Sequence, residues 1–157
     1  LVNQNTIPCK PEEIEKIRKV CTKGNKIVVK PTKVDLKLVD YDGIIYLIDI
    51  KTAKPNFGQF KEFKRTLLEW VATTLAENPE INIKTLIAIP YNPYEPQPYH
   101  RWTMKGVIDV KEELEVASEF WDFLSKEAIY DELLNVFEEV GNVLRGEIDN
   151  YFQKFKN

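Results

Sequence analysis

The sequence predicts an α/β fold in which helices flank a mixed β-sheet and further helices follow at the C-terminal end. Three observations support this prediction. Apolar residues alternate on both sides of a turn at 40–43, the period of two that is typical of strands with one buried face. An apolar stripe with helical spacing then runs from 57 to 77, and a continuous apolar run over 85–89 indicates a strand buried on both faces.

Length and composition indicate one globular domain over residues 1–157. The chain is 43% hydrophobic and 30% charged, as in folded soluble proteins and unlike disordered ones. No apolar run approaches the roughly 20 residues needed to span a bilayer, and no signal peptide opens the chain. We therefore expect a cytoplasmic protein with no membrane partner. Because residue 1 is Leu and not Met, residues upstream could be missing.

The first predicted element is a helix from Pro8 to Cys21. Pro11 suits its first turn, acidic residues follow at the positive end of the helix dipole, and basic residues come later. A short strand is predicted over 27–29. Cys9 and Cys21 could in principle pair, but because no secretory signal is found we expect both to be reduced. They lack His or Cys companions at zinc spacing, so we assign them no metal.

A β-hairpin follows, and its register can be inferred from the turn. A three-residue loop at 41–43 keeps the apolar residues of both strands on one face, whereas a two-residue turn shifts the pairing by one and breaks that face. The three-residue loop is therefore preferred. On the opposite face it pairs Asp35 with Asp49 and sets Lys51 across from Lys33. The predicted apolar pairs are Leu38–Tyr46, Leu36–Ile48 and Val34–Ile50.

Two carboxylates that face each other across a strand pair repel, by roughly 0.2–1 kcal/mol even when exposed. A divalent cation shared by Asp35 and Asp49 would remove this repulsion, and Mg²⁺ typically takes one or two carboxylates with water and substrate phosphate. Lys51 projects from the same face, beside the water that such a cation would bind. A solvated strand face with mixed charges is the alternative, but the opposed Asp35 and the basic helix that follows favour the metal site.

The net charge of −3 conceals an uneven distribution. Residues 10–65 hold 14 Lys and Arg against 8 Asp and Glu, whereas residues 66–157 hold 8 against 17. The basic part contains Asp35, Asp49 and Lys51, and a phosphate-binding face needs only local positive charge. The acidic part suits solvation or a partner surface. Candidate DNA contacts in the basic part are Lys33, Lys37, Lys54, Asn56, Lys61, Lys64 and Arg65.

A helix is predicted from Phe57 to Glu77, after a loop marked by Pro55. Its first turns carry basic side chains beside the charged face of the hairpin, where they either contact phosphate or only solvate the helix. Gln59, in the first turn, could contact substrate, or it could orient the water molecule that attacks the substrate if the site is hydrolytic. The sequence does not decide between these roles.

A strand is predicted over 84–90, and because a helix connects it to the hairpin we expect it to run parallel to the preceding strand. It leads into a proline-rich loop, 91–102, with three tyrosines, a tryptophan and the one histidine. This loop either presents amide, aromatic and guanidinium groups to DNA or packs over the sheet; both remain open. Its candidate DNA contacts are Asn92, Gln97, His100 and Arg101.

The C-terminal part is predicted to be mainly helical. A short strand at 106–108 is followed by a helix led by Asp109, and a last helical region begins near Ile129. Gly141 and Gly146 weaken that last region and could bend or split it. The apolar residues assigned to the helix led by Asp109 are Leu114, Ala117, Phe120, Trp121 and Leu124.

Asp35, a turn, and then Asp49-Ile50-Lys51 on the second strand resemble the PD-(D/E)xK nuclease core, with Pro31 a few residues ahead of Asp35 instead of adjacent to it. More specifically, VDLKLVDYDGIIYLIDIKTAKPNFGQFKEFKRTLLEW and the later EFWDFLSKE and YDELLNVFEEVG resemble the TdeIII-like type II restriction endonucleases. The resemblance covers about residues 32–149.

This resemblance implies a restriction-endonuclease-like core that cleaves double-stranded DNA at a short specific site in a Mg²⁺-dependent reaction. Asp35 and Asp49 would bind Mg²⁺, the Ile50 backbone carbonyl would add a ligand, and Lys51 would orient the attacking water. An acidic residue on the first helix, Glu13 or Glu15, would be an accessory member of the site. A homodimer is implied too, with a cognate DNA methyltransferase as a functional and not a physical partner.

Two other functions stay open. One is a structure-specific resolvase or repair nuclease on the same core, which would cut junctions or damaged duplexes without sequence dependence. The other is a non-catalytic DNA-binding or assembly module, which would bind DNA and show no Mg²⁺-dependent cleavage.

Overall fold

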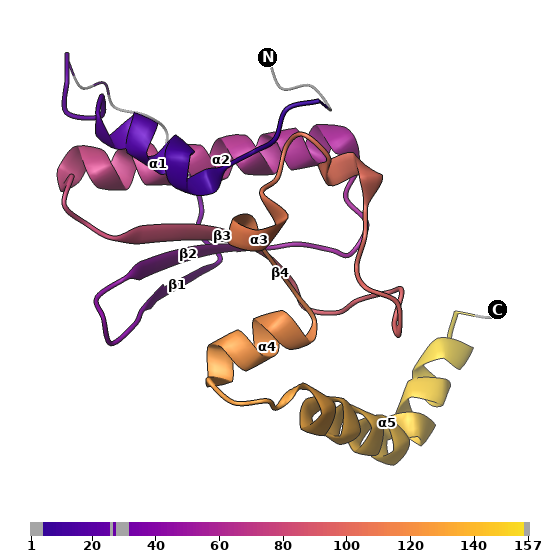
Figure 1. Ribbon diagram of the computed structural model, residues 1–157. Coiled ribbons are helices and arrows are strands. Elements are labelled where there is room, and N and C mark those ends of the chain that lie inside the picture. The colour runs from indigo at the N-terminus through magenta and orange to yellow at the C-terminus, as the bar shows by residue number, and fades with distance from the viewer. Residues whose placement is uncertain (1–4, 26, 28–31, 156–157) are drawn as a thin grey trace. The chain divides into compact units, whose positions relative to one another are not determined.

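The computed structural model describes residues 5–25, 27 and 32–155 (Figure 1). The elements in chain order are α1 (Lys10–Arg18), β1 (Leu36–Val39), β2 (Ile45–Ile50), α2 (Phe57–Glu77), β3 (Ile83–Ile89), η1 (Trp102–Met104), α3 (Val110–Glu113), β4 (Leu114–Val116), α4 (Ser118–Ser125) and α5 (Tyr130–Gln153). They form two compact units, residues 1–116 and 117–157. The single domain expected over 1–157 stays a prediction.

The first unit is built on a four-stranded sheet with the order β1-β2-β3-β4. β1 is antiparallel to β2, whereas β2 is parallel to β3 and β3 to β4. Figure 1 shows α1 and α2 together on one face of this sheet. The predicted α/β class with a mixed sheet, flanking helices and C-terminal helices is therefore confirmed.

The hairpin has the predicted register. Leu36 pairs with Ile48 and Leu38 with Tyr46, and the Asp40 N–H donates to the Ile44 carbonyl at 3.1 Å. Gly43 closes the loop with a φ of +77°, a conformation that glycine adopts without strain. The ladder ends at Leu36 and Ile48, so the predicted pair of Val34 with Ile50 lies beyond it, and Ile50 is 40% exposed and does not extend the buried face.

The helix α2 has the predicted bounds, and its start has a clear physical cause. The Asn56 side chain accepts the Gln59 N–H while the Gln59 side chain accepts the Asn56 N–H, which is a capping box. The buried face of the helix includes Phe60, Leu67 and Leu75. The strand β3 follows in parallel to β2, as predicted, and all of its residues except Lys84 are buried.

The sequence prediction is wrong over 106–117. Gly106 has a φ of +76°, and the N–H groups of Val107 and Ile108 both donate to the Met104 carbonyl, so this segment is a turn and not a strand. The helix led by Asp109 stops after the single turn of α3, and the chain enters β4. The backbone of this segment pairs with β3, and the side chains of Leu114 and Val116, at alternate positions, are both buried. This alternation is typical of a strand, which is why β4 forms here.

The second unit consists of α4 and α5. Asp122 Oδ1 accepts the N–H groups of Ile129 and Tyr130, at 2.9 and 3.2 Å, and so satisfies free donors at the start of α5. α5 is one continuous helix through Gly141 and Gly146, so the expected split is absent, whereas Figure 1 shows the helix changing direction along its length. Apolar side chains along α5 are exposed: Leu134, Phe137, Val140, Leu144, Ile148 and Phe152.

The strand predicted over 27–29 falls mainly outside the described residues. Within the described part of the chain, no helix combines the length and apolar character that crossing a membrane requires.

Candidate active site

The hairpin brings Asp35 and Asp49 together. The register that pairs Leu36 with Ile48 sets the two aspartates opposite each other, close enough for each carboxyl group to affect the pKa of the other. The Ile50 N–H donates to Asp35 Oδ2 at 3.0 Å and so fixes Asp35 against the end of β2. The Asp35 side chain is 27% exposed and that of Asp49 is 9% exposed. The pair therefore combines one accessible and one nearly buried carboxyl group.

Lys51 lies at the same site. Its Nζ is 2.6 Å from Asp49 Oδ1 and 4.9 Å from the centre of the Phe63 ring on α2. Its backbone N–H donates to the Ala88 carbonyl at 2.8 Å, so the pairing of β2 with β3 continues through Lys51. The three side chains proposed from the sequence as catalytic are thus adjacent.

The two carboxyl groups have opposite pKa shifts. The hydrogen bond from the Ile50 N–H lowers the pKa of Asp35, and Lys33, whose Nζ lies 3.3 Å from Asp35 Oδ1, acts in the same direction. Burial raises the pKa of Asp49 and outweighs the opposing effect of the Lys51 amine. Neighbouring carboxyl groups with pKa values pushed apart are typical of functional sites.

Asparagine at the two positions should change stability in opposite directions. A carboxyl group whose pKa is raised by folding costs stability once the pH passes that pKa, whereas one whose pKa is lowered contributes stability that is lost on acidification. At pH 7 without divalent cations, we expect Asp49→Asn to raise the melting temperature by about 2 °C or more, and Asp35→Asn to lower it slightly.

Calorimetry in EDTA measures both shifts. The gain from Asp49→Asn should vanish below about pH 3, where the carboxyl group of the unfolded chain is also protonated. A lower melting temperature for Asp49→Asn at pH 7 would mean that the ion pair with Lys51 outweighs the cost of burial, which contradicts the sign of the pKa shift.

The oxygen atoms at this site suit a hard divalent cation. Asp35 and Asp49 supply two carboxylates. Within an antiparallel pair, the N–H and C=O of one residue point to the same side, so the Ile50 carbonyl faces the strand that carries Asp35, as its N–H does. Among the described residues, no cluster of three or more His, Cys, Asp or Glu could hold a metal ion. Two carboxylates and one carbonyl, all oxygen donors, suit a cation that keeps water and substrate oxygens as ligands, whereas structural zinc sites use Cys and His.

The expected accessory residues have other partners. Glu13 Oε2 lies 2.5 Å from Lys64 Nζ, and Glu15 Oε1 accepts the Arg18 Nε–H at 3.0 Å. Gln59 Oε1 accepts the Asn56 N–H at 2.8 Å within the capping box of α2. Their part in a metal site stays a prediction.

Lys64 lies in the core, which argues against the phosphate contact expected of it. It is 6% exposed, and its Nζ is also 2.6 Å from Glu113 Oε2. Glu113 in turn binds Lys10 Nζ at 2.7 Å. Lys64 therefore belongs to a cluster with Lys10, Glu13 and Glu113, all of them buried except the partly exposed Glu13, which the sequence did not suggest.

The remaining basic candidates lie at the surface. Lys61 is exposed, with its Nζ 4.4 Å from the centre of the Phe57 ring, and Arg65 Nε is 2.7 Å from Glu69 Oε1. Lys54 Nζ lies 5.7 Å from the centre of the Tyr94 ring. Lys33, Lys37 and Asn56 are also exposed, although the Asn56 side chain caps α2 and Lys33 Nζ lies beside Asp35.

The loop that follows β3 is irregular, as predicted, and part of it packs against the protein. Arg101 donates from Nη1 to the Tyr94 hydroxyl at 3.0 Å and from Nη2 to the Pro55 carbonyl at 3.2 Å. Asn92 Nδ2 donates to the Gln97 carbonyl at 2.8 Å. The side chains of Arg101 and Asn92 are thus engaged internally, whereas Gln97 and His100 are exposed.

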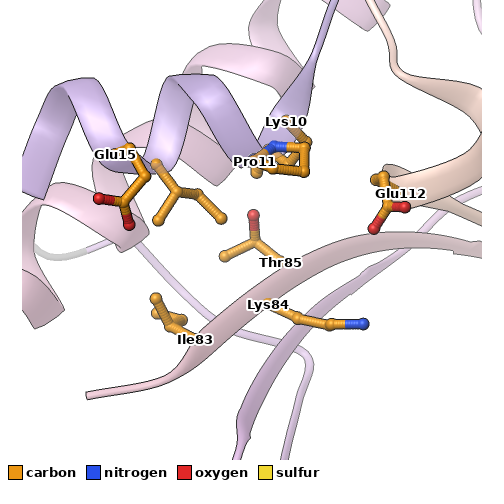
Figure 2. A pocket seen from close by; sticks show the side chains of 8 residues that line it. Lys10, Pro11, Glu15, Ile83, Lys84, Thr85 and Glu112 are labelled. Atoms are coloured by element: carbon orange, nitrogen blue, oxygen red, sulfur yellow. The ribbon is translucent and has the colours of Figure 1, made fainter. Parts of the chain in front are cut away.

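The structure also contains a pocket of about 230 Å³ that the sequence did not indicate (Figure 2). It lies between α1, the start of β3 and α3. Figure 2 shows Thr85 among the labelled lining residues, and the buried Thr85 hydroxyl has no hydrogen-bond partner within the described part of the chain. Neither aspartate of the pair nor Lys51 lines this pocket, so it is separate from the candidate active site. Its lining residues are Lys10, Pro11, Ile14, Glu15, Ile83, Lys84, Thr85 and Glu112.

Comparison with known proteins gives concordant results. The family model described as "Type II restriction endonuclease, HinfI" matches residues 1–141. The type II restriction enzyme HgiCII of Herpetosiphon aurantiacus is 30% identical over 151 residues, which cover 93% of this chain and 53% of that enzyme. The type II restriction enzyme HgiEI of the same organism is 30% identical over 118 residues, 74% of this chain and 42% of that enzyme. The chain thus spans about half the length of the curated relatives it matches.

Proposed function

The chain belongs to the HinfI family of type II restriction endonucleases, and from this premise we propose that it hydrolyses double-stranded DNA at a short specific site. The observation that supports this most directly is the meeting of Asp35, Asp49 and Lys51 at the end of β2. Because the chain spans only part of its relatives, the activity of the whole protein is part of this proposal.

In the proposed reaction, Asp35, Asp49 and the Ile50 carbonyl would hold Mg²⁺. The ion, when bound, polarises the phosphate and lowers the pKa of a bound water molecule. Lys51 leaves its contact with Asp49, orients the attacking water and stabilises the charge that develops on the phosphate oxygens. Phe63 covers the Lys51 amine on one side and limits the directions in which it can move.

Several finer parts of the proposal rest on the nuclease assignment. Cutting both strands of a symmetric site suits a homodimer, and a cognate methyltransferase would protect the host DNA. Cytoplasmic location follows from that substrate. The TdeIII-like subtype remains a narrower proposal within the family.

DNA contacts are proposed for the exposed basic residues near the site, and Lys61 is the clearest test. If its amine neutralises one phosphate, Lys61→Gln should flatten the dependence of log K on log salt concentration by about 0.9. Fluorescence anisotropy of a labelled duplex, without Mg²⁺ and from 50 to 200 mM salt (roughly the range over which such contacts weaken), measures this slope. Lys111→Gln, at an exposed lysine on α3, is the matched control. An unchanged slope in Lys61→Gln would remove Lys61 from the DNA contacts.

The experiment that tests the function is incubation of the purified chain with unmethylated plasmid and Mg²⁺, followed by sequencing of the DNA ends. We expect discrete fragments whose ends share one short sequence. Cleavage confined to junctions or damaged DNA would indicate a structure-specific nuclease, and binding without cleavage would indicate a non-catalytic module.

A further inference from the structure

Three alternate residues of the loop after β3 reach the same neighbouring segment. Tyr99 Oη donates to the Ala53 carbonyl at 2.7 Å, Arg101 Nη2 to the Pro55 carbonyl at 3.2 Å, and Thr103 Oγ1 to the Pro55 carbonyl at 3.3 Å. Tyr99 and Arg101 are alternate residues of the chain that leads into η1, and alternate residues of an extended chain project to the same side. Thr103 reaches the same segment from η1 itself, so three donors are directed toward residues 53–55, while His100 and Trp102 between them are exposed.

The segment that receives these bonds begins at Lys51. The Lys51 N–H is held by the Ala88 carbonyl at 2.8 Å, and the far end of the segment is held by the capping box of Asn56. Ala53 and Pro55, which lie between these two anchors, are buried. Water has little access to their carbonyl groups, so the loop side chains are the partners that satisfy them.

We propose that Tyr99, Arg101 and Thr103 act as a clamp on residues 51–56, and that Tyr99 is a positioning residue for Lys51. This inference rests on the proposed nuclease function. Lys51 must exchange its contact with Asp49 for one with water or phosphate. Its backbone must stay in place while its side chain moves, and the bond from Tyr99 to Ala53 lies two residues away from it.

Other contacts agree with a constitutive clamp. Burial raises the pKa of Tyr99 to about 12, so its hydroxyl stays protonated, and able to donate, across the neutral and moderately alkaline range. Arg101 donates from Nη1 to the Tyr94 hydroxyl, and Tyr94 and Tyr99 contact each other with ring centres 5.9 Å apart. The clamp therefore has its own internal packing and does not depend on a bound ligand.

Tyr99→Phe tests the clamp because it removes the hydroxyl and keeps the ring. At saturating DNA and Mg²⁺, we expect the single-turnover cleavage rate to fall about tenfold or more, since displacement of a catalytic group by about 1 Å can cost up to a hundredfold. The Kd for DNA should change less than about twofold, roughly the scatter expected of a site that makes no direct contact. Tyr41→Phe, at a fully exposed tyrosine of the hairpin loop, is the matched control and should match the wild type.

Two substitutions of Thr103 test the clamp independently of Tyr99. Thr103→Val removes the hydroxyl and keeps the shape, and we expect it to slow cleavage, whereas Thr103→Ser keeps the hydroxyl and should retain the wild-type rate. If the substitutions acted only through a general loss of packing, the cleavage rate would not depend on whether the hydroxyl is present.

Hydrogen exchange of the Lys51 amide, measured by mass spectrometry without DNA or metal, gives a readout that does not need activity. We expect this exchange to be faster in Tyr99→Phe than in the wild type and in Tyr41→Phe. Unchanged exchange in Tyr99→Phe would overturn the clamp, and a loss of cleavage that merely follows a loss of DNA affinity would overturn the positioning role. A wild type that cleaves no DNA would refute the proposed function, while the exchange result would still decide whether the clamp holds this segment.

Discussion

Asp49→Asn is expected to lower the DNA cleavage rate by about a thousandfold, because it removes one of the two charges that hold the cation against the phosphate. The substitution keeps the size of the side chain, and Asp49 is nearly buried beside Lys51. A single-turnover assay with excess protein and saturating Mg²⁺ measures the loss directly.

The matched control is Asp42→Asn, which changes an exposed aspartate in the loop of the same hairpin and should leave cleavage intact. Two results for Asp49→Asn together would be diagnostic: the expected higher melting temperature without metal, and the loss of cleavage. A protein that is more stable and yet inactive has lost a functional charge and not its fold. Cleavage within about tenfold of the wild type would remove Asp49 from the mechanism, since about 1.4 kcal/mol is far less than a cation ligand should supply.

Lys51→Met is expected to lower the same rate by about a hundredfold or more, the effect typical of removing one donor aimed at developing charge. Methionine keeps the length and the contact with Phe63 but has no ammonium group. DNA binding without Mg²⁺ should be largely retained. The assay is the single-turnover rate compared with the Kd for a specific duplex.

Lys105→Met, at an exposed lysine far along the chain from the candidate site, is the control for this substitution. We also expect Lys51→Arg to restore only part of the rate, because a planar guanidinium does not place its donors as an ammonium does. Full activity in Lys51→Met would show that the amine neither orients water nor stabilises charge in the reaction.

The hairpin and its aspartate pair were predictable from the sequence because several constraints agree. Only one loop length keeps the apolar residues of both strands on one face, and that length sets Asp35 opposite Asp49. The bounds of α2 were predictable for a similar reason, since its apolar stripe begins just after Asn56 and its end is marked by Asn78-Pro79.

The positions that the sequence did not reveal depend on partners distant along the chain. Lys64 follows Phe60 and precedes Leu67 at helical spacing, so its side chain points into the core, but its partner Glu113 is 49 residues away. Likewise, β4 has three residues, too few for its alternation to stand out from the helical pattern around it. The donors of the clamp, Tyr99, Arg101 and Thr103, stand at alternate positions in the sequence. Their acceptors are backbone carbonyl groups, which every residue has, so the sequence does not indicate them.

The proposed function requires Asp35 and Asp49 to share a divalent cation against a DNA phosphate. Anomalous diffraction at the manganese edge, from crystals of the chain with Mn²⁺ and a non-hydrolysable duplex, shows directly where the cation binds. We expect a peak within bonding distance of both aspartate carboxylates and the Ile50 carbonyl, with Lys51 turned from Asp49 toward the phosphate. A peak that contacts neither aspartate, or a duplex bound away from the end of β2, would contradict the proposed function.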